Sequence, residues 1–251
     1  MDIDLKTQPS HVLEAIDFIK QVIQDYTLEN CSISFNGGKD CTVLLHLCRL
    51  AILSLGLDWS QFSVIYFSSR EFPEIEEFIQ STAKQYNFNI NRLGGSFREG
   101  LEHLLATTPI KAIFMGQRRV DPAGSRLQLI SPSDPGWPAV DRINPILEWD
   151  HDQVWNFLRD NNLPYCSLYD KGYTSLGSPN TTKPNPLLLK PESEGGGYYP
   201  AYHLKDGNQE RAGRVASTWN NKPKTTDSTT AHSTTTTASP KEDTKQVQSD
   251  L

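Results

Sequence analysis

Two adjacent glycines, a lysine and an acid stand together in the run Asn36-Gly37-Gly38-Lys39-Asp40. A short apolar stretch ends before this run and an amphipathic stretch begins after it, which predicts a turn from a strand into a helix. Glycine permits a positive φ, helix N-termini attract anions, and a lysine neutralises phosphate charge. We therefore interpret the run as a cradle for the phosphates of a nucleoside triphosphate. The plainer alternative is an ordinary strand-to-helix turn with a surface lysine.

Residues 116–122, Gly-Gln-Arg-Arg-Val-Asp-Pro, form a second polar cluster directly after another strand-like stretch. Ligands of parallel α/β sheets bind at the carboxyl ends of the strands, so we expect Asn36 and Gln117 at the same edge. Two arginines and an aspartate there suit a polyphosphate or another polar substrate. The alternative is a solvated loop with local ion pairs.

Trp137 lies in a loop, where Pro135 and Gly136 precede it and Pro138 follows it. An aromatic ring held by prolines can stack on a planar heterocycle. The alternative is that the indole folds back as a lid on the core.

Arg211 and Arg214 form a third group of charged residues, shortly before the Ser- and Thr-rich C-terminal segment. Side chains three residues apart on a helical turn face the same way, so this pair can clamp a phosphate. The alternative is the solvated end of a helix, where cations favour the dipole.

Five blocks of the chain, taken in order, resemble the signature blocks of the eukaryotic FAD synthase (FMN adenylyltransferase) family. The blocks are residues 34–40, 116–122, 134–138, 169–177 and 210–214. That family belongs to the adenine nucleotide alpha-hydrolase-like superfamily, which also contains PAPS reductases. Because the chain begins shortly before the first block, it resembles the single-domain form. The resemblance implies a parallel-sheet α/β domain followed by a C-terminal flavin-binding portion.

The resemblance also implies roles for individual residues. The implied catalytic residues are Asn36, Asp40, Arg211 and Arg214. The implied ATP-binding residues are Ile33, Ser34, Gly37, Gly38, Lys39 and Gln117. The implied flavin-binding residues are Asp121, Asp134, Pro135, Gly136 and Trp137, together with Arg211 and Arg214. Asp40 is the implied ligand of Mg²⁺.

The activity implied by the resemblance is transfer of AMP from ATP to FMN, which gives FAD and pyrophosphate, with Mg²⁺ as cofactor. One alternative is a sulfonucleotide (PAPS) reductase of the same superfamily. That chemistry needs a nucleophilic cysteine in a C-terminal segment, and no cysteine follows Cys166. A tRNA-thiolating enzyme would need paired catalytic cysteines and a basic surface. A further alternative that the sequence leaves open is a carrier that binds flavin without turnover.

The elements that must position these residues follow from hydrophobic periodicity. Strand-like stretches occupy 31–36, 62–67, 88–93 and 110–115. The predicted helices span 11–26, with Ser10 as the N-cap, 40–55, 73–86 and 96–105. A further helix starts at Asp150 as its N-cap, with Gln153 at the position of a capping box. This alternation predicts an α/β fold, a parallel twisted sheet with helices on both faces. Residues 117–145 and 163–200 show neither helix nor strand periodicity.

We expect an ATP-binding α/β domain at residues 1–160 and a flavin-binding portion at 161–215 packed on it. Residues 216–251 are rich in Ser and Thr and almost free of large apolar side chains. Such a composition buries too little surface to offset the entropy of ordering, so we predict a disordered tail.

The chain of 251 residues carries a net charge of −6, which does not suit nucleic-acid binding. Its four cysteines include no Cys-x-x-Cys pair, so we expect packed, reduced thiols. No apolar run reaches the ~18 residues of a membrane span, and the N-terminus lacks the apolar region of a signal peptide. The expected protein is a cytoplasmic monomer that binds small molecules, with neither nucleic acid nor membrane as a partner.

Overall fold

The structure, a computed structural model, describes residues 3–67, 71–122 and 124–215. The disordered tail predicted for 216–251 lies outside these described residues.

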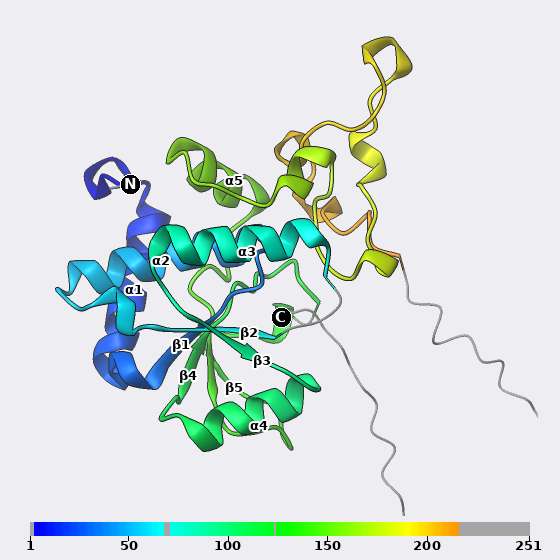
Figure 1. Ribbon diagram of the computed structural model, residues 1–251. Helices are drawn as coiled ribbons and strands as arrows, with labels where there is room; N and C mark the ends of the chain where they lie inside the picture. Colours follow the sequence, from blue (N-terminus) through cyan, green and yellow to red (C-terminus); the bar gives the residue numbers. More distant parts are fainter. Residues whose placement is uncertain (1–2, 68–70, 123, 216–251) are drawn as a thin grey trace, which may run out of the picture.

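Within the described ranges, six strands form a sheet in the order β3-β2-β1-β4-β6-β5 (Figure 1). The strands are β1 Cys31–Ser34, β2 Ser63–Phe67, β3 Ile90–Leu93, β4 Ala112–Phe114, β5 Ile130–Pro132 and β6 Asp141–Ile143. Neighbouring strands are parallel, except that β5 runs antiparallel to β6 at the edge. Ile33 of β1 pairs with Val64 of β2 and with Phe114 of β4. The expected parallel sheet is confirmed, with one antiparallel edge strand added.

The order of the strands reverses between β1 and β4, because the chain continues from β1 toward β3 on one side and from β4 toward β6 on the other. Ligands of open α/β sheets bind at such a switch point, beyond the carboxyl ends of the strands. Asn36 follows β1 and Gln117 follows β4, and these strands are parallel neighbours. Both polar clusters therefore leave the sheet at the same edge.

Helices cover both faces of the sheet, as expected. They are α1 Ser10–Tyr26, α2 Lys39–Ser54, α3 Pro73–Tyr86, α4 Phe97–Thr107 and α5 His151–Asp160. Figure 1 shows α1, α2, α3 and α5 on one side and α4 on the other. Ile33, Leu44 and Ile79 belong to the larger buried cluster, and Leu104 and Ile113 belong to the smaller one that includes α4.

Two helix starts illustrate how the sequence fixes these elements. Asp150 and Gln153 form a capping box at the start of α5, as the sequence predicts, because each side chain accepts a backbone N–H of the other. Ser10, the expected N-cap of α1, is instead the first helical residue, and Pro9 is the N-cap. Proline fixes its own φ near the value seen there, so the extended Pro9 leads directly into the helix.

Strands β5 and β6 correct the expectation that 117–145 has no regular structure. Each strand has three residues, which is too short for an alternating pattern to appear in the sequence. β6 is a strand because β4 beside it offers unpaired backbone groups, so tertiary pairing decides the conformation.

Residues 161–215 contain short 3₁₀ turns, from Ser167–Lys171 to Gly207–Gln209. Leu168 and Tyr169 from this portion belong to the main buried cluster. Figure 1 shows this yellow-to-orange segment at one side of the helical layer, and the turn at 167–171 contacts α3.

All four cysteines are buried free thiols, which agrees with the packed thiols expected. None of the helices in the placed segments combines the length and hydropathy needed to cross a bilayer.

Candidate active site

The glycine loop between β1 and α2 has the conformation that its sequence predicts. Gly37 has a φ of +73°, and a Cβ there would lie 3.1 Å from Ile79 and 3.3 Å from Ile75 of α3. The side-chain Oδ1 of Asn36 accepts the backbone N–H of Gly38 at 2.9 Å. Gly38 is then the N-cap of α2, so the loop presents the positive end of that helix.

Lys39 is buried rather than on the surface, with a side-chain exposure of 3%. Its Nζ lies 3.0 Å from Oδ2 of Asp40 and 2.8 Å from Oε2 of Glu210. Arg118 completes the group, because its Nε lies 2.8 Å from Oδ1 of Asp40 and its Nη2 lies 2.5 Å from Oε2 of Glu210. We call these four residues the ion network. The surface-lysine alternative for the loop is therefore wrong.

Lys39, Asp40 and Arg118 keep their charges despite burial, because opposite charges lie beside them. Burial alone would lower the pKa of Lys39, but Asp40 and Glu210 outweigh it and raise that pKa. Burial alone would raise the pKa of Asp40, but Arg118 and Lys39 lower it. The pKa of Arg118 is likewise raised, since both carboxylates outweigh its burial. Two cations and two anions thus form a neutral, mostly buried group at the sheet edge.

Tyr169 also reaches the glycine loop from the C-terminal portion. Its hydroxyl oxygen accepts the backbone N–H of Lys39 at 2.7 Å, and the residue is 1% exposed. That N–H is one of the donors that a helix N-terminus leaves without an intrahelical partner. The sequence placed Tyr169 in a family block but gave it no role; the block itself was the available signal.

The second polar cluster packs directly against the first. A Cβ at Gly116 would lie 2.8 Å from the backbone nitrogen of Cys41, so glycine permits this close approach. Oδ2 of Asp121 accepts the backbone N–H of Arg118 at 2.8 Å. Burial, followed by the charge of Asp40, raises the pKa of Asp121. Among the described residues, the buried Oε1 of Gln117 has no hydrogen-bond partner.

Ile33 and Ser34 lie in β1, with exposures of 0% and 4%. Both side chains are buried beneath the glycine loop, so the structure gives them a supporting position. Their contact with ATP stays a prediction.

The turn at 134–137 has a different set of contacts from the glycine loop. The backbone N–H of Trp137 donates to the carbonyl oxygen of Asp134 at 3.0 Å, and Gly136 has a φ of +85°. Arg142 lies 3.3 Å from the Asp134 carboxylate. Pro135 occupies the second position of this turn, where its fixed φ fits.

Trp137 combines features of both interpretations made from the sequence. Its ring centroid lies 5.8 Å from that of Phe97, and the guanidinium of Arg98 lies 5.9 Å from the ring. The residue is nevertheless 38% exposed. It packs on the start of α4 and still offers aromatic surface to a ligand.

Arg211 and Arg214 follow Glu210 in a turn rather than on a helix, which corrects the expected helical turn. Nη1 of Arg214 donates to the carbonyl oxygen of Leu176 at 2.8 Å. A Cβ at Gly177 would lie 2.5 Å from that guanidinium, so glycine makes room for it. The structure thus brings the arginine segment next to the ion network through Glu210.

Among the described residues, no group of three or more His, Cys, Asp or Glu side chains is placed so that it could hold a metal ion by itself. Two acidic side chains of the site, Asp40 and Glu210, pair with cations, and a third, Asp121, accepts the backbone N–H of Arg118.

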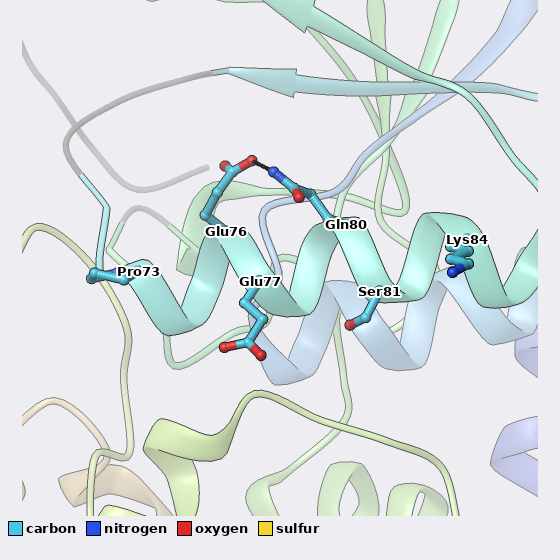
Figure 2. Close-up of a pocket in the computed structure, with 6 residues that line it drawn as sticks. All are labelled: Pro73, Glu76, Glu77, Gln80, Ser81 and Lys84. Carbon is cyan, nitrogen blue, oxygen red and sulfur yellow. Dashed lines mark hydrogen bonds between the residues drawn. The ribbon is translucent and has the colours of Figure 1, made fainter.

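A surface hollow of about 690 Å³ runs along α3 (Figure 2). Its lining consists of Pro73, Glu76, Glu77, Gln80, Ser81 and Lys84. Figure 2 shows these side chains on successive turns of one helix, with Glu76 accepting a hydrogen bond from Gln80. It includes none of the predicted site residues, and we place the candidate site where the buried charges converge instead.

Comparisons with known proteins match most of the chain. Residues 30–96 and 97–184 match the phosphoadenosine phosphosulfate reductase domain family, a span that includes both polar clusters. A probable FAD synthase of Schizosaccharomyces pombe is 39% identical over 207 residues, which cover 80% of this chain and 77% of that protein. A probable FAD synthase of Caenorhabditis elegans is 40% identical over 205 residues, 80% of this chain and 40% of that protein. The chain thus spans less than half the length of the second relative.

Solved structures of the Candida glabrata FMN adenylyltransferase share the fold. Its complex with FAD and inorganic pyrophosphate has a TM-score of 0.74 at 27% identity, over 85% of this chain and 93% of that chain. Its complex with FMN and the ATP analogue AMPCPP has a TM-score of 0.72 at 28% identity, with the same coverage.

Proposed function

Because the chain belongs to the FAD synthase family and contains the phosphoadenosine phosphosulfate reductase domain, we infer that it transfers AMP from ATP to FMN. The products are FAD and pyrophosphate, the ligands of the related Candida glabrata complex. One observation supports this function at the level of individual residues. The side chains of Lys39 and Arg118 meet at the Glu210 carboxylate beside the glycine loop, where the strand order of the sheet reverses.

The reaction needs positioning and charge neutralisation more than covalent help from the protein. An oxygen of the FMN phosphate attacks the α-phosphorus of ATP and forms the new P–O bond. The bond from that phosphorus to the bridging oxygen breaks, and pyrophosphate leaves with the electron pair. The FMN phosphate is already anionic, so no general base is required. Lys39 and Arg118 offset the repulsion between the two anions.

The glycine loop is proposed to bind the ATP phosphates. Gly37 keeps the backbone turn open, and Gly38 places the N-terminus of α2 toward the anion. Asn36 fixes the turn through its bond to Gly38. Gln117, with a buried and unpartnered side-chain oxygen among the described residues, is proposed to contact the adenosine part of ATP.

We propose that Mg²⁺ arrives with ATP and binds at the carboxylates of this site. Both carboxylates contact Arg118: Oδ1 of Asp40 lies 2.8 Å from its Nε, and Oδ2 of Asp121 accepts its backbone N–H at 2.8 Å. Mg²⁺ is commonly held by one or two carboxylates together with substrate phosphates. Asp40 would hold it, with Asp121 nearby, and the ion would neutralise phosphate charge. Because Asp40 also pairs with Lys39 and Arg118, we assign it one ligand position at most.

The flavin side of the site is proposed from the 134–137 turn and the arginine segment. Trp137 offers an exposed aromatic surface for the isoalloxazine ring, and Asp134 and Asp121 supply polar contacts. Arg211 and Arg214 suit the phosphate of FMN, because guanidinium groups pair well with phosphates. On this proposal residues 161–215 complete the flavin site.

The cysteines argue against reductase chemistry for this family member. Burial raises the pKa of Cys41 to about 12 and that of Cys166 to about 11. Buried thiols with raised pKa values are poor nucleophiles. The buried free thiols also suit the reducing cytoplasm, which we propose as the compartment, with the monomer as the functional unit.

The test is a purified-protein assay with ATP, FMN and Mg²⁺, followed through FAD fluorescence and pyrophosphate release. We expect stoichiometric FAD and pyrophosphate. Asp40→Asn is expected to lower turnover about 100-fold or more. Asp17→Asn, on the exposed face of α1, serves as the control and should leave turnover unchanged. Binding of FMN without either product would favour the carrier instead.

A further inference from the structure

We propose that Glu210 is a positioning residue, which holds Lys39 and Arg118 in place and competes with substrate phosphates for them. This inference rests on the proposed function of the ion network.

Glu210 contacts both cations of the ion network. One oxygen, Oε2, lies 2.8 Å from Nζ of Lys39 and 2.5 Å from Nη2 of Arg118. The side chain is 7% exposed, and its two partners are 3% and 1% exposed. A single carboxylate oxygen thus joins the lysine of the first polar cluster to an arginine of the second.

The backbone at Glu210 is held as firmly as its side chain. Oγ1 of Thr174 donates to the carbonyl oxygen of Glu210 at 2.6 Å. Nδ2 of Asn185 donates to Oγ1 of Thr174 at 3.0 Å and to the carbonyl oxygen of Gln209 at 2.9 Å. Asn185 and Thr174 are 0% and 2% exposed. The carboxylate is therefore presented by a rigid, buried support from the C-terminal portion.

Glu210 makes the network neutral, and this has a consequence for phosphate binding. Without its charge, Lys39 and Arg118 would face Asp40 alone, which leaves one excess positive charge in a buried place. An arriving phosphate must share the two cations with the Glu210 carboxylate. Among the described residues, Nη1 of Arg118 has no hydrogen-bond partner, so that guanidinium keeps a donor for an anion. Glu210 thus aims the cations and limits how tightly they hold pyrophosphate.

Glu210 also links the two substrate regions. Arg211 follows it directly, so the residue that holds the two cations is adjacent in the chain to the segment proposed to hold the FMN phosphate. This placement gives the residue a position between both substrates.

The experiment compares wild type, Glu210→Gln, Glu210→Asp and the control Glu192→Gln, whose side chain is on an exposed 3₁₀ turn. Inorganic pyrophosphate with Mg²⁺ is titrated by calorimetry, and FAD formation gives kcat and KM for ATP. Glu210→Gln should bind pyrophosphate about fivefold more tightly, because an anion that competes with it is gone. Its kcat should fall about tenfold or more, because the two cations are no longer held in position and the product pyrophosphate dissociates slowly.

Glu210→Asp should keep the pyrophosphate affinity within about twofold of wild type while kcat falls to an intermediate value, since the charge remains on a shorter side chain. Glu192→Gln should match wild type in both measurements. A merely structural role would weaken pyrophosphate binding in Glu210→Gln, and that result, or an unchanged affinity, overturns the proposal. If Glu210→Gln does not fold, a wild-type kcat in Glu210→Asp overturns it. Wild type that binds pyrophosphate but makes no FAD would contradict the proposed function instead, and the affinities would still decide the role of Glu210.

Discussion

The hydroxyl of Tyr169 accepts the backbone N–H of Lys39 at 2.7 Å, although the two residues are 130 positions apart in the chain. The contact connects the C-terminal portion to the first residue of α2. Together with the ion pair between Glu210 and Lys39, it means that the glycine loop is completed only when the C-terminal portion has folded onto it.

Tyr169→Phe should therefore weaken the glycine loop. The change leaves the Lys39 N–H buried without an acceptor, which costs about 1–3 kcal/mol in the free energy of unfolding. Turnover should fall as well, since Lys39 is proposed to act on phosphate. Urea unfolding and FAD formation provide the two measurements. Tyr199→Phe, at a hydroxyl that bonds an exposed glutamate, should change the free energy of unfolding by about 0.5 kcal/mol or less.

Gly37→Ala should destabilise the protein more than Gly195→Ala. Both glycines have a positive φ, so alanine is strained at each by about 1–2 kcal/mol. Only at Gly37 would the new Cβ also meet α3, at 3.1 Å from Ile79, whereas Gly195 has nothing within 4 Å. The difference between the two variants in thermal unfolding isolates the packing contribution. Equal losses of stability would show that α3 yields to the methyl group.

The parallel sheet and its helices were predictable because each of these elements has a strong local pattern. The helix α1 shows the apolar spacing of three and four residues, and β2 lies in a short, continuous run of β-prone residues. The edge strands β5 and β6 were not predictable, because three residues carry too little pattern and pairing with β4 decides their conformation. Local signals specify elements that are long enough to repeat.

The site follows the same division between local and distant information. The glycine loop is specified by adjacent residues, and the positive φ of Gly37 agrees with the use of glycine predicted there. The partners of Lys39 could not be derived this way, because Tyr169 and Glu210 lie 130 and 171 residues away. Arg118 was noted as a charged loop residue, yet its 1% exposure results from packing that no local pattern shows.

Trp137→Ala should raise KM for FMN about tenfold and leave KM for ATP unchanged, if the indole stacks on the flavin. Trp137→Phe keeps an aromatic surface and should retain most of the affinity. Initial rates of FAD formation at varied FMN give both constants. A variant that loses stability while KM for FMN stays at the wild-type value would instead support the lid on α4, where Trp137 packs against Phe97.

Asp121 and Asp40 should change the stability of the fold in opposite directions as the pH rises from 3 to 7. Burial and the charge of Asp40 raise the pKa of Asp121 above its ordinary value of 3.8. A raised pKa means that this carboxyl group stabilises the fold below pH 3.8 and loses that contribution as the pH rises through its folded pKa. The free energy of unfolding of Asp121→Asn, relative to wild type, should therefore increase with pH.

Asp40 has the reverse sign, because Arg118 and Lys39 outweigh its burial and lower its pKa. Its contribution is present above pH 3.8 and is lost as the pH falls through the lower, folded pKa. Asp40→Asn should thus be less stable than wild type at pH 7, by about 3–5 kcal/mol for a broken buried pair. The deficit should shrink as the pH falls below 3.8. Urea unfolding of wild type and both variants at pH 3, 5 and 7 gives, for each variant, the slope against pH of its free energy of unfolding relative to wild type. Parallel slopes would contradict the assignment of a raised pKa to one carboxyl group and a lowered pKa to the other.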